Sequence, residues 1–519
     1  MSSKYSNQLS YASVTYIFYT IFGAMSILKI KVLKLLIKSL ICIYFSRVLC
    51  YNTKKRSIRI CTEKENRLML NNKWEAIEST AAPEVVKALK KLHAFYEGRK
   101  MAEWSANLYD PEVGGFYYSN SARDTEGYAP DLESTWQTLG LISSNGGYKS
   151  ADSALPDDIK QKIVDFVKST QSSEDGYFYH PQWPQGKQNL NNDRYGRDMG
   201  WATSLLSQLK PYGEEQYPNY CTPNGMKCRK HHGTDDSCFA PVQNESEKKE
   251  VDTAPRSGNQ PDYSSREAFS AWLEEYDKDI KLASGRAHNL AALRGEIVAH
   301  GYADVVLDFY DRIQEELYEE HVARGIEPTG VWQTNLDYHV VWGVWKHLYY
   351  YNCEQCRRPI NLKYAPYMIR SCVKVLLQKI EIPHAMNDLF NQWVSINAVI
   401  SNVRTHYGDE AAEPLYEIVR ESATELVDMT LEKVSPFKND DGTVVYRSVG
   451  TGMTSIYGVP IALGVREGDA NGMNLCCSMH NAVFSCLGYK PVPIMDESDG
   501  ARFVEMIKAA KPIKKNPKP

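Results

Sequence analysis

The feature that most constrains the fold of this chain is an apolar periodicity of helical type that continues, with few breaks, from residue 83 onward. Apolar side chains that recur every three to four residues are typical of amphipathic helices. The periodic stretches lie at 84–107, 131–144, 156–170, 198–209, 266–281, 286–299, 302–320, 330–350, 363–379, 384–406, 411–433 and 471–487. They predict an all-α domain of twelve helices, followed by a short helix in the tail.

Charge alternates along these stretches. The first, third, seventh and eleventh carry charged faces, for example VVKALKKLHAFYEGRK and DDIKQKIVDFVKS. The second, fourth, eighth and tenth are almost free of charge, for example LESTWQTLGLI and LFNQWVSINAVI. A helix with a charged face usually lies against solvent, whereas one that is apolar all round is buried. The alternation therefore predicts six hairpins closed into a ring, an (α/α)6 toroid with the uncharged helices inside.

Three connections from a charged to an uncharged helix repeat one pattern. They read DPEVGGFYYS, SEDGYFYHPQW and NDDGTVVYR. Asp and Gly suit a tight turn, and the aromatic or β-branched run that follows suits a short extended segment. We therefore expect short β-like connections that place these rings at the mouth of the ring of helices.

One of these connections resembles a known repeat. Gln171, Asp175 and Gly176, followed by aromatic residues and Trp183, resemble the Q-DG-W repeat of the terpenoid cyclase and protein prenyltransferase toroids. The helix count equally resembles that of the six-hairpin glycosidases. The resemblance covers residues 83–490 at the level of architecture and implies the α/α-toroid superfamily. The acidic motifs D-x-D-D and D-D-x-x-D are missing, and the zinc ligands of the prenyltransferases have no counterpart, so the resemblance carries no isoprenoid chemistry.

The toroid domain is expected to occupy residues 83–490, and the segments around it differ in composition. Residues 1–70 are either an extension or a signal anchor, because the uncharged run at 11–28 is just long enough to span a bilayer and is followed by lysines. The chain would be membrane-anchored in the second case and cytoplasmic in the first. Residues 211–265 are polar and predict a flexible insertion, and 491–519 form a C-terminal tail.

Charge and cysteine spacing limit the partners. The formal net charge of -4 provides no basic footprint for nucleic acid, so we expect none as a partner. Cys353 and Cys356 form a single pair without a second pair at zinc-finger spacing. A second group, with irregular spacing in a polar segment, comprises Cys221, Cys228, His231, His232 and Cys238. It is either a set of ordinary loop thiols or a metal site. Its irregular spacing favours the thiols, so neither a metal nor a cofactor is expected.

Three aspartates are the catalytic candidates. Asp337 is the one charged residue in the Trp-rich stretch VWQTNLDYHVVWGVW. A carboxyl buried there must be paired or neutral, so it is either a general acid with a raised pKa or a structural group tied to a partner. Asp131 precedes LESTWQTL and Asp198 precedes MGWATSLL, so each is either a helix N-cap or the second carboxylate of the reaction.

Other polar and aromatic side chains on the uncharged helices and their connections would bind the substrate. Asn387, Asn391 and Ser395 fall on one helix face at a spacing of four residues. The predicted substrate-binding residues are Glu133, Trp136, Trp183, Trp201, Arg197, Arg286, His288, His339, Asn387 and Asn391.

Aromatic rings, side-chain amides and several carboxylates around one mouth describe a carbohydrate groove. The sequence thus favours a glycan-processing enzyme, a glycoside hydrolase or lyase, that acts on a carbohydrate or another small molecule. Two alternatives remain open. One is a toroid of the isoprenoid cyclase or transferase type, and the other is a scaffold that binds glycan or peptide without catalysis.

Overall fold

A computed structural model describes residues 73–171, 177–182, 193–209, 261–282, 287–334, 336, 344–353, 356–379, 385–448 and 461–518. All of them belong to a compact unit at residues 70–519. Their regular structure is helical, with only isolated β-bridges besides. The helices are α3 (Pro83–Ala94), α4 (Gly98–Asn107), α5 (Asn120–Arg123), α6 (Leu132–Ser144), α7 (Ala151–Ala154), α8 (Asp157–Ser169), α9 (Asp193–Gln208), α11 (Arg266–Tyr276), α12 (Ala287–Ala299), α13 (Ala303–Ala323), α14 (Val344–Tyr351), α15 (Ala365–Leu377), α16 (Asn387–Tyr407), α17 (Asp409–Arg420), α18 (Ala423–Val434), the 3-10 helix η5 (Ser435–Phe437), α19 (Ala470–Cys486) and α20 (Glu497–Lys508).

The all-α prediction is confirmed for the described residues, and the helix bounds follow from local sequence. The helix α8 has Asp157 and Asp158 in its first turn and Lys168 in its last, so its charges complement the helix dipole. Its apolar face, which includes Ile163 and Val164, is fully buried. Two predicted helices are each divided in two, the first into α3 and α4 and the eleventh into α17 and α18.

The helix predicted at 330–350 is wrong over its first residues. Residues 331–334 are not helical, and α14 begins only at Val344. The indole N–H of Trp332 donates to the carbonyl of Tyr310 at 3.0 Å, and the backbone N–H of Thr334 donates to the carbonyl of Lys281 at 2.9 Å. The preceding Gly330 has a φ of 70°, which a helix cannot accommodate. Tertiary hydrogen bonds therefore override the apolar periodicity here.

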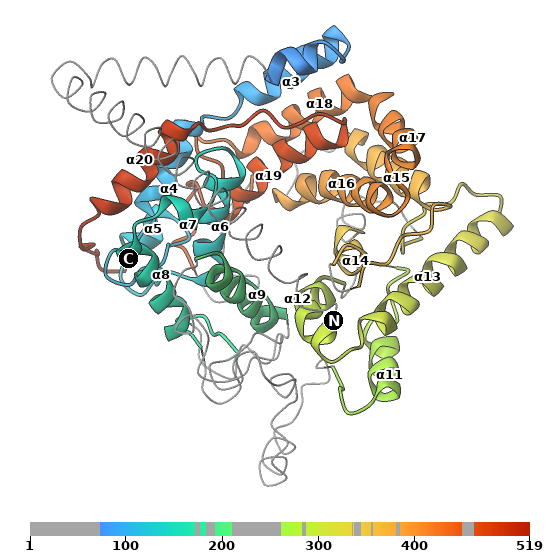
Figure 1. Ribbon diagram of the computed structural model, residues 1–519, viewed down its shortest axis with the longest axis horizontal. Coiled ribbons are helices and arrows are strands. Elements are labelled where there is room, and N and C mark those ends of the chain that lie inside the picture. Colours follow the sequence, from blue (N-terminus) through green and yellow to red (C-terminus); the bar gives the residue numbers. More distant parts are fainter. Residues whose placement is uncertain are drawn as a thin grey trace, which may run out of the picture. The chain divides into compact units, whose positions relative to one another are not determined.

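Six helices contact one another in a closed cycle. The helix α6 packs against α9, α9 against α12, α12 against α14, α14 against α16, α16 against α19, and α19 against α6 (Figure 1). These are the second, fourth, sixth, eighth, tenth and twelfth of the stretches predicted from sequence. Most of the other long helices pack against a member or a neighbour of this cycle, as α8 does against α9 and α15 against α16, and α4 packs against α20.

Side-chain hydrogen bonds cross the contacts of the cycle. The indole of Trp136 donates to the hydroxyl of Ser204 at 3.0 Å, which joins α6 to α9. The hydroxyl of Tyr350 donates to the carbonyl of Leu290 at 2.7 Å, which joins α14 to α12. Because these polar atoms are largely withdrawn from water, each bond stabilises one register of its helix pair.

The three repeated connections share a local structure. Each contains one isolated antiparallel bridge across its turn, namely Tyr109 with Phe116, Gln171 with Phe178, and Lys438 with Val444. The bridge brings the residue before the turn back beside the aromatic or β-branched run.

The membrane anchor predicted at 11–28 stays a prediction, because the described residues do not include it. No helix that the structure describes is long and apolar enough to span a bilayer. The uncharged run at 11–28 and most of the insertion at 211–265 lie outside the described residues.

Candidate functional site

Tyr446 lies at the meeting point of two helix starts. Its backbone N–H donates to Oδ2 of Asp469, the N-cap of α19, at 2.6 Å. Its carbonyl accepts from the N–H of Met386, the N-cap of α16, at 2.8 Å. A Cβ at Gly472 would lie 2.5 Å from the backbone nitrogen of Tyr446, so only glycine lets this connection approach α19 so closely. The backbone at Tyr446 is therefore fixed on both sides.

The phenol of Tyr446 is surrounded by charges of both signs. Burial raises its pKa, and the carboxylates of Asp388 and Glu133 raise it further. The guanidinium groups of Arg197 and Arg447 act in the opposite direction. The phenol is thus a neutral hydrogen-bond donor at physiological pH. Its hydroxyl makes no hydrogen bond with any other described residue, and the side chain is only partly buried, so it can donate to a ligand.

Asp469 is a carboxyl group that titrates near neutrality. Burial raises its pKa from 3.8 to about 7, although hydrogen bonds from the N–H groups of Gly472 and Tyr446 and from the hydroxyl of Tyr118 lower it. At 2% exposure it has almost no contact with water. We call the seven residues that are linked here by hydrogen bonds or by electrostatic interactions the Tyr446 cluster, namely Tyr118, Glu133, Arg197, Asp388, Tyr446, Arg447 and Asp469.

Four helix starts contribute to this cluster. Glu133, Arg197 and Asp388 lie within the first two turns of α6, α9 and α16, and Asp469 precedes α19. The amide of Gln137 on α6 donates to Glu133 at 3.2 Å and to Asn471 on α19 at 3.0 Å. Its own oxygen is buried without a partner among the described residues. A cluster of helix starts with spare polar atoms favours polar or anionic ligand groups.

Asp131 is the N-cap of α6, one of the two roles expected for it. Its Oδ1 accepts from the N–H of Ser134 at 2.7 Å and its Oδ2 accepts from the hydroxyl of Ser134 at 3.0 Å. The ring of His180 lies 3.7 Å from the same carboxylate. Both side chains are nearly inaccessible to solvent. Its geometry therefore accounts for a capping role without any substrate.

Asp198 does not cap its helix, so that expectation is wrong. The helix α9 begins at Asp193, five positions earlier than the start expected from the apolar pattern, because the polar residues before Asp198 already continue the helix. Asp198 is 1% exposed, within the second turn. Its neighbour Arg197 stacks over the ring of Trp201 at 5.4 Å, which brings a cation and an aromatic face of α9 together.

The predicted amide stripe on α16 is largely buried. Asn391 is 2% exposed, and its Oδ1 accepts from the indole of Trp345 at 2.8 Å. The hydroxyl of Ser395 donates to the carbonyl of Asn391 at 2.7 Å. The Nδ2 of Asn391 and the Oδ1 of Asn387 have no partner among the described residues. These spare amide atoms are near the start of α16, because Asn387 precedes Asp388 directly and Asn391 follows it by about one helical turn.

Several predicted site residues cannot be placed. Asp337, His339, Trp183 and Arg286 lie outside the described residues, as does the side chain of His288. The general-acid role of Asp337 therefore stays a prediction. The group of Cys221, Cys228, His231, His232 and Cys238 also lies outside the described part of the chain. Within that part, no three metal-ligating side chains are grouped to hold an ion.

A second near-neutral carboxyl lies on α12 and was not predicted from sequence. Burial raises the pKa of Glu296 to about 7, against hydrogen bonds from Tyr177 and Tyr263 that lower it. The hydroxyl of Tyr177 donates to Oε2 of Glu296 at 2.7 Å. Tyr177 belongs to the connection SEDGYFYHPQW, so one ring of that pattern fastens the connection to α12 rather than facing a ligand.

Comparisons of this chain with protein-family models, with curated proteins and with solved structures found no match.

Proposed function

We propose that the chain is a glycan-processing enzyme, a glycoside hydrolase or lyase, whose α6, α9, α12, α14, α16 and α19 form the inner ring of an (α/α)6 toroid. The closed cycle of contacts among these helices supports the toroid. The reaction takes place at the Tyr446 cluster, where the starts of four inner helices meet.

The observation that carries this proposal is that two carboxylates from different helices interact electrostatically with one phenol, whose hydroxyl makes no hydrogen bond with another described residue. Glu133 and Asp388 both raise the pKa of Tyr446. Glycoside cleavage requires two carboxyl groups on either side of the scissile bond, one that donates a proton to the leaving oxygen and one that acts on the sugar or on water. Glu133 is partly exposed and is assigned the proton donor, and the buried Asp388 its partner.

The remaining residues of the cluster position the substrate. The neutral hydroxyl of Tyr446 donates a hydrogen bond to a sugar oxygen, and Trp201 with Arg197 provides a face for the apolar side of a sugar ring. Asp469 acts through Tyr446, because it holds the backbone of that residue in place. Asp337 remains a further candidate for general acid, and Asp131 and Asp198 remain candidates for its partner.

The test uses the full chain and a panel of oligosaccharides, with new reducing ends measured for hydrolysis and absorbance of the unsaturated product for elimination. Glu133→Gln and Asp388→Asn should each lower turnover by roughly 10²-fold or more, as expected for acid–base catalysis. The control is Asp496→Asn, because Asp496 caps α20 and is not a member of the cluster. If folded Glu133→Gln and Asp388→Asn both keep the parent rate, the assignment is wrong.

The scaffold alternative predicts a different result from the same experiment. A glycan-binding protein would bind one oligosaccharide, lose affinity in Tyr446→Phe, and release no product. The isoprenoid alternative is disfavoured by the four charged side chains around Tyr446, because bringing an apolar chain against them would remove their hydration.

A further inference from the structure

Two side-chain amides near the start of α16 carry atoms without a hydrogen-bond partner among the described residues, namely Nδ2 of Asn391 and Oδ1 of Asn387. Asn391 is 2% exposed, so its amide has almost no contact with water. Buried polar groups in native proteins are nearly always hydrogen-bonded, because an unpaired group loses its hydration without replacement. A buried amide N–H that no described residue satisfies therefore points to an acceptor on a ligand.

The orientation of the Asn391 amide follows from its other hydrogen bond. Its Oδ1 accepts from the indole N–H of Trp345 on α14 at 2.8 Å. An indole N–H can only donate, so the amide atom that faces it must be the oxygen, and Nδ2 points the other way. The spare atom of Asn391 is thus a donor, and the spare atom of Asn387 is an acceptor.

The spacing of the two amides selects the kind of group that they bind. Asn387 and Asn391 lie one turn apart on the same face of α16, and side chains at this spacing have Cβ atoms about 5–6 Å apart. The C=O and N–H of a trans secondary amide point to opposite sides, so such a group fits between a donor and an acceptor at this separation. A sugar hydroxyl, whose donor and acceptor share one oxygen, suits the span less well.

Three aromatic rings lie beside the two amides, and we call Phe390, Trp345 and Tyr349 the aromatic strip. The ring of Trp345 meets that of Phe390 edge to face, with the centroids 6.4 Å apart, and that of Tyr349 in the same way at 5.4 Å. Phe390 and Trp345 are partly exposed, and Tyr349 is exposed. An apolar surface next to a few directed polar groups is typical of small-molecule sites.

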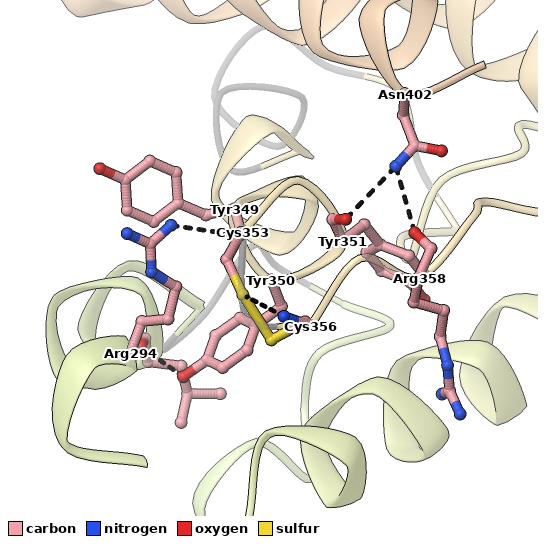
Figure 2. Close-up of a disulfide and its surroundings, with 9 residues drawn as sticks. Arg294, Tyr349, Tyr350, Tyr351, Cys353, Cys356, Arg358 and Asn402 are labelled. Carbon is pink, nitrogen blue, oxygen red and sulfur yellow. Dashed lines mark hydrogen bonds between the residues drawn. A yellow bond between two sulfur atoms is a disulfide. The ribbon is translucent and has the colours of Figure 1, made fainter. Parts of the chain in front are cut away.

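The last ring of the aromatic strip is fixed by a cation. The guanidinium of Arg294 on α12 lies over the ring of Tyr349, 3.9 Å from its centroid, and donates to the carbonyl of the same residue at 3.0 Å (Figure 2). The strip is therefore a surface formed before any ligand arrives. A site of this kind loses little conformational entropy when it binds.

The two amides also adjoin the Tyr446 cluster. Met386, which directly precedes Asn387, donates its backbone N–H to the carbonyl of Tyr446 at 2.8 Å. Asp388, which directly follows Asn387, belongs to the cluster. A sugar substituent held by the amides would therefore place its sugar ring close to the carboxyl groups to which the reaction was assigned.

We propose that Asn387, Asn391 and Trp345 form a subsite for the acetamido group of an N-acetylhexosamine. The inference rests on the glycan-processing function proposed above and names its substrate class. The Nδ2 group of Asn391 donates to the acetamido carbonyl, and Oδ1 of Asn387 accepts from the acetamido N–H. The methyl group packs against the rings of Trp345 and Phe390.

The first measurement is saturation-transfer NMR of the full chain with N-acetylglucosamine and N-acetylgalactosamine, with glucose and galactose as controls. The acetylated sugars should bind, and their acetamido methyl protons should receive the strongest saturation. The dissociation constants of glucose and galactose should be roughly tenfold higher or more, because the two amides then lack their partners. Equal affinity for acetylated and plain sugars, or no binding of any of the four, would contradict the proposal.

The second measurement is the same titration with two variants. Asn391→Asp keeps the acceptor for the indole of Trp345 but loses the Nδ2 donor, and Asn387→Ala removes the partly exposed acceptor. Each should weaken binding of the acetylated sugars by roughly tenfold. The matched control is Asn397→Ala, which changes an asparagine on another face of α16 and should leave affinity unchanged. If folded Asn387→Ala binds N-acetylglucosamine as tightly as the parent does, the subsite is wrong.

This subsite and the glycan-processing function fail in different ways. If the parent binds N-acetylated sugars through Asn387 but cleaves none of the oligosaccharides, the enzymatic function is wrong and the subsite stands. If the parent cleaves oligosaccharides in a reaction that Glu133→Gln abolishes, yet shows no preference for acetylated ones in binding or cleavage, the subsite is wrong and the function stands.

Discussion

The backbone N–H of Tyr446 donates to the carboxyl of Asp469 at 2.6 Å, and the same carboxyl caps α19 through the N–H of Gly472 at 2.7 Å. One buried side chain thus fixes both a helix start and the connection that carries the phenol. A change in the charge of Asp469 must therefore affect the stability of the fold and the position of Tyr446 together.

Asp469 should make the protein less stable as pH rises. Its pKa is about 7 in the folded chain and 3.8 ordinarily, so between these values the folded state holds a proton that the unfolded state has lost. The free energy of unfolding then falls by about 1 kcal/mol per pH unit for this group. In Asp469→Asn this contribution disappears, so the difference between variant and parent in urea unfolding should shift in favour of the variant from pH 4.5 to 7. Parallel curves would contradict the pKa assigned to Asp469.

His480 should make the protein less stable as pH falls below 6.5. Burial, with help from the neighbouring His93, lowers the pKa of His480 from 6.5 to about 3. Between these values the unfolded chain binds a proton that the folded chain does not, so stability is lost as pH falls from 6.5 toward 3. His480→Gln should therefore unfold less steeply with acid than the parent. The measurement is the melting temperature from pH 4 to 7, and an unchanged slope would rule out His480 as the source.

Gly472 should tolerate no side chain. A Cβ there would lie 2.5 Å from the nitrogen of Tyr446 and 2.5 Å from the carbonyl carbon of Val445, both backbone atoms. Gly472→Ala should cost about 1–3 kcal/mol of stability, as overpacking of a tight contact does. The matched control is Gly200→Ala in α9, where a Cβ meets nothing within 4 Å. That change should be neutral or stabilise by up to about 1 kcal/mol, because alanine is the better helix former. Equal effects of the two changes in urea unfolding would contradict the close approach.

Lys433 is a buried cation whose replacement should stabilise the protein. Burial lowers its pKa from 10.5 to about 8, and its ammonium donates to the carbonyl of Leu376. Lys433→Met keeps the side-chain volume and should add about 1–2 kcal/mol at pH 7, since no charge is then withdrawn from water. Between pH 8 and 10.5 the unfolded parent holds the extra proton, so its stability rises with pH and the advantage of the variant should vanish. A variant that is less stable than the parent at pH 7 would show that the bond to Leu376 outweighs the cost of burial.

The helices were predictable because their apolar period is local. The uncharged stretch LFNQWVSINAVI became α16, and its Leu389, Trp393 and Ile396 are fully buried. The region 330–334 was not predictable, because Trp332 and Thr334 make hydrogen bonds to residues far from them in sequence, Tyr310 of α13 and Lys281 in the turn after α11. The apolar periodicity of a sequence carries no information about such hydrogen bonds.

The site was predictable only in kind. The run DGTVVYR suggested that aromatic rings lie in the connections, and Tyr446 is the ring of that run. Asp469 carries the same capping signal as Asp131, an aspartate before an apolar helix, yet the predicted caps were Asp131 and Asp198 and did not include it. Glu133 and Asp388 both influence the phenol of Tyr446 because the folded chain brings their helices together. Spacing in the sequence cannot reveal this proximity.

The cycle of helix contacts also has a consequence for biosynthesis. The helix α6 packs against α19, and the hydrogen bond from Gln137 to Asn471 joins residues that are 334 positions apart in sequence. A ribosome releases the N-terminal helices long before α19 exists, so the face of α6 that α19 covers stays open to solvent until nearly the whole chain has emerged. At about 5–20 residues per second, this interval is roughly 15 seconds to a minute. During this interval the nascent chain exposes the apolar face of α6 that α19 covers in the folded protein. We therefore expect the yield of native protein to depend on chaperones that bind such exposed apolar surfaces.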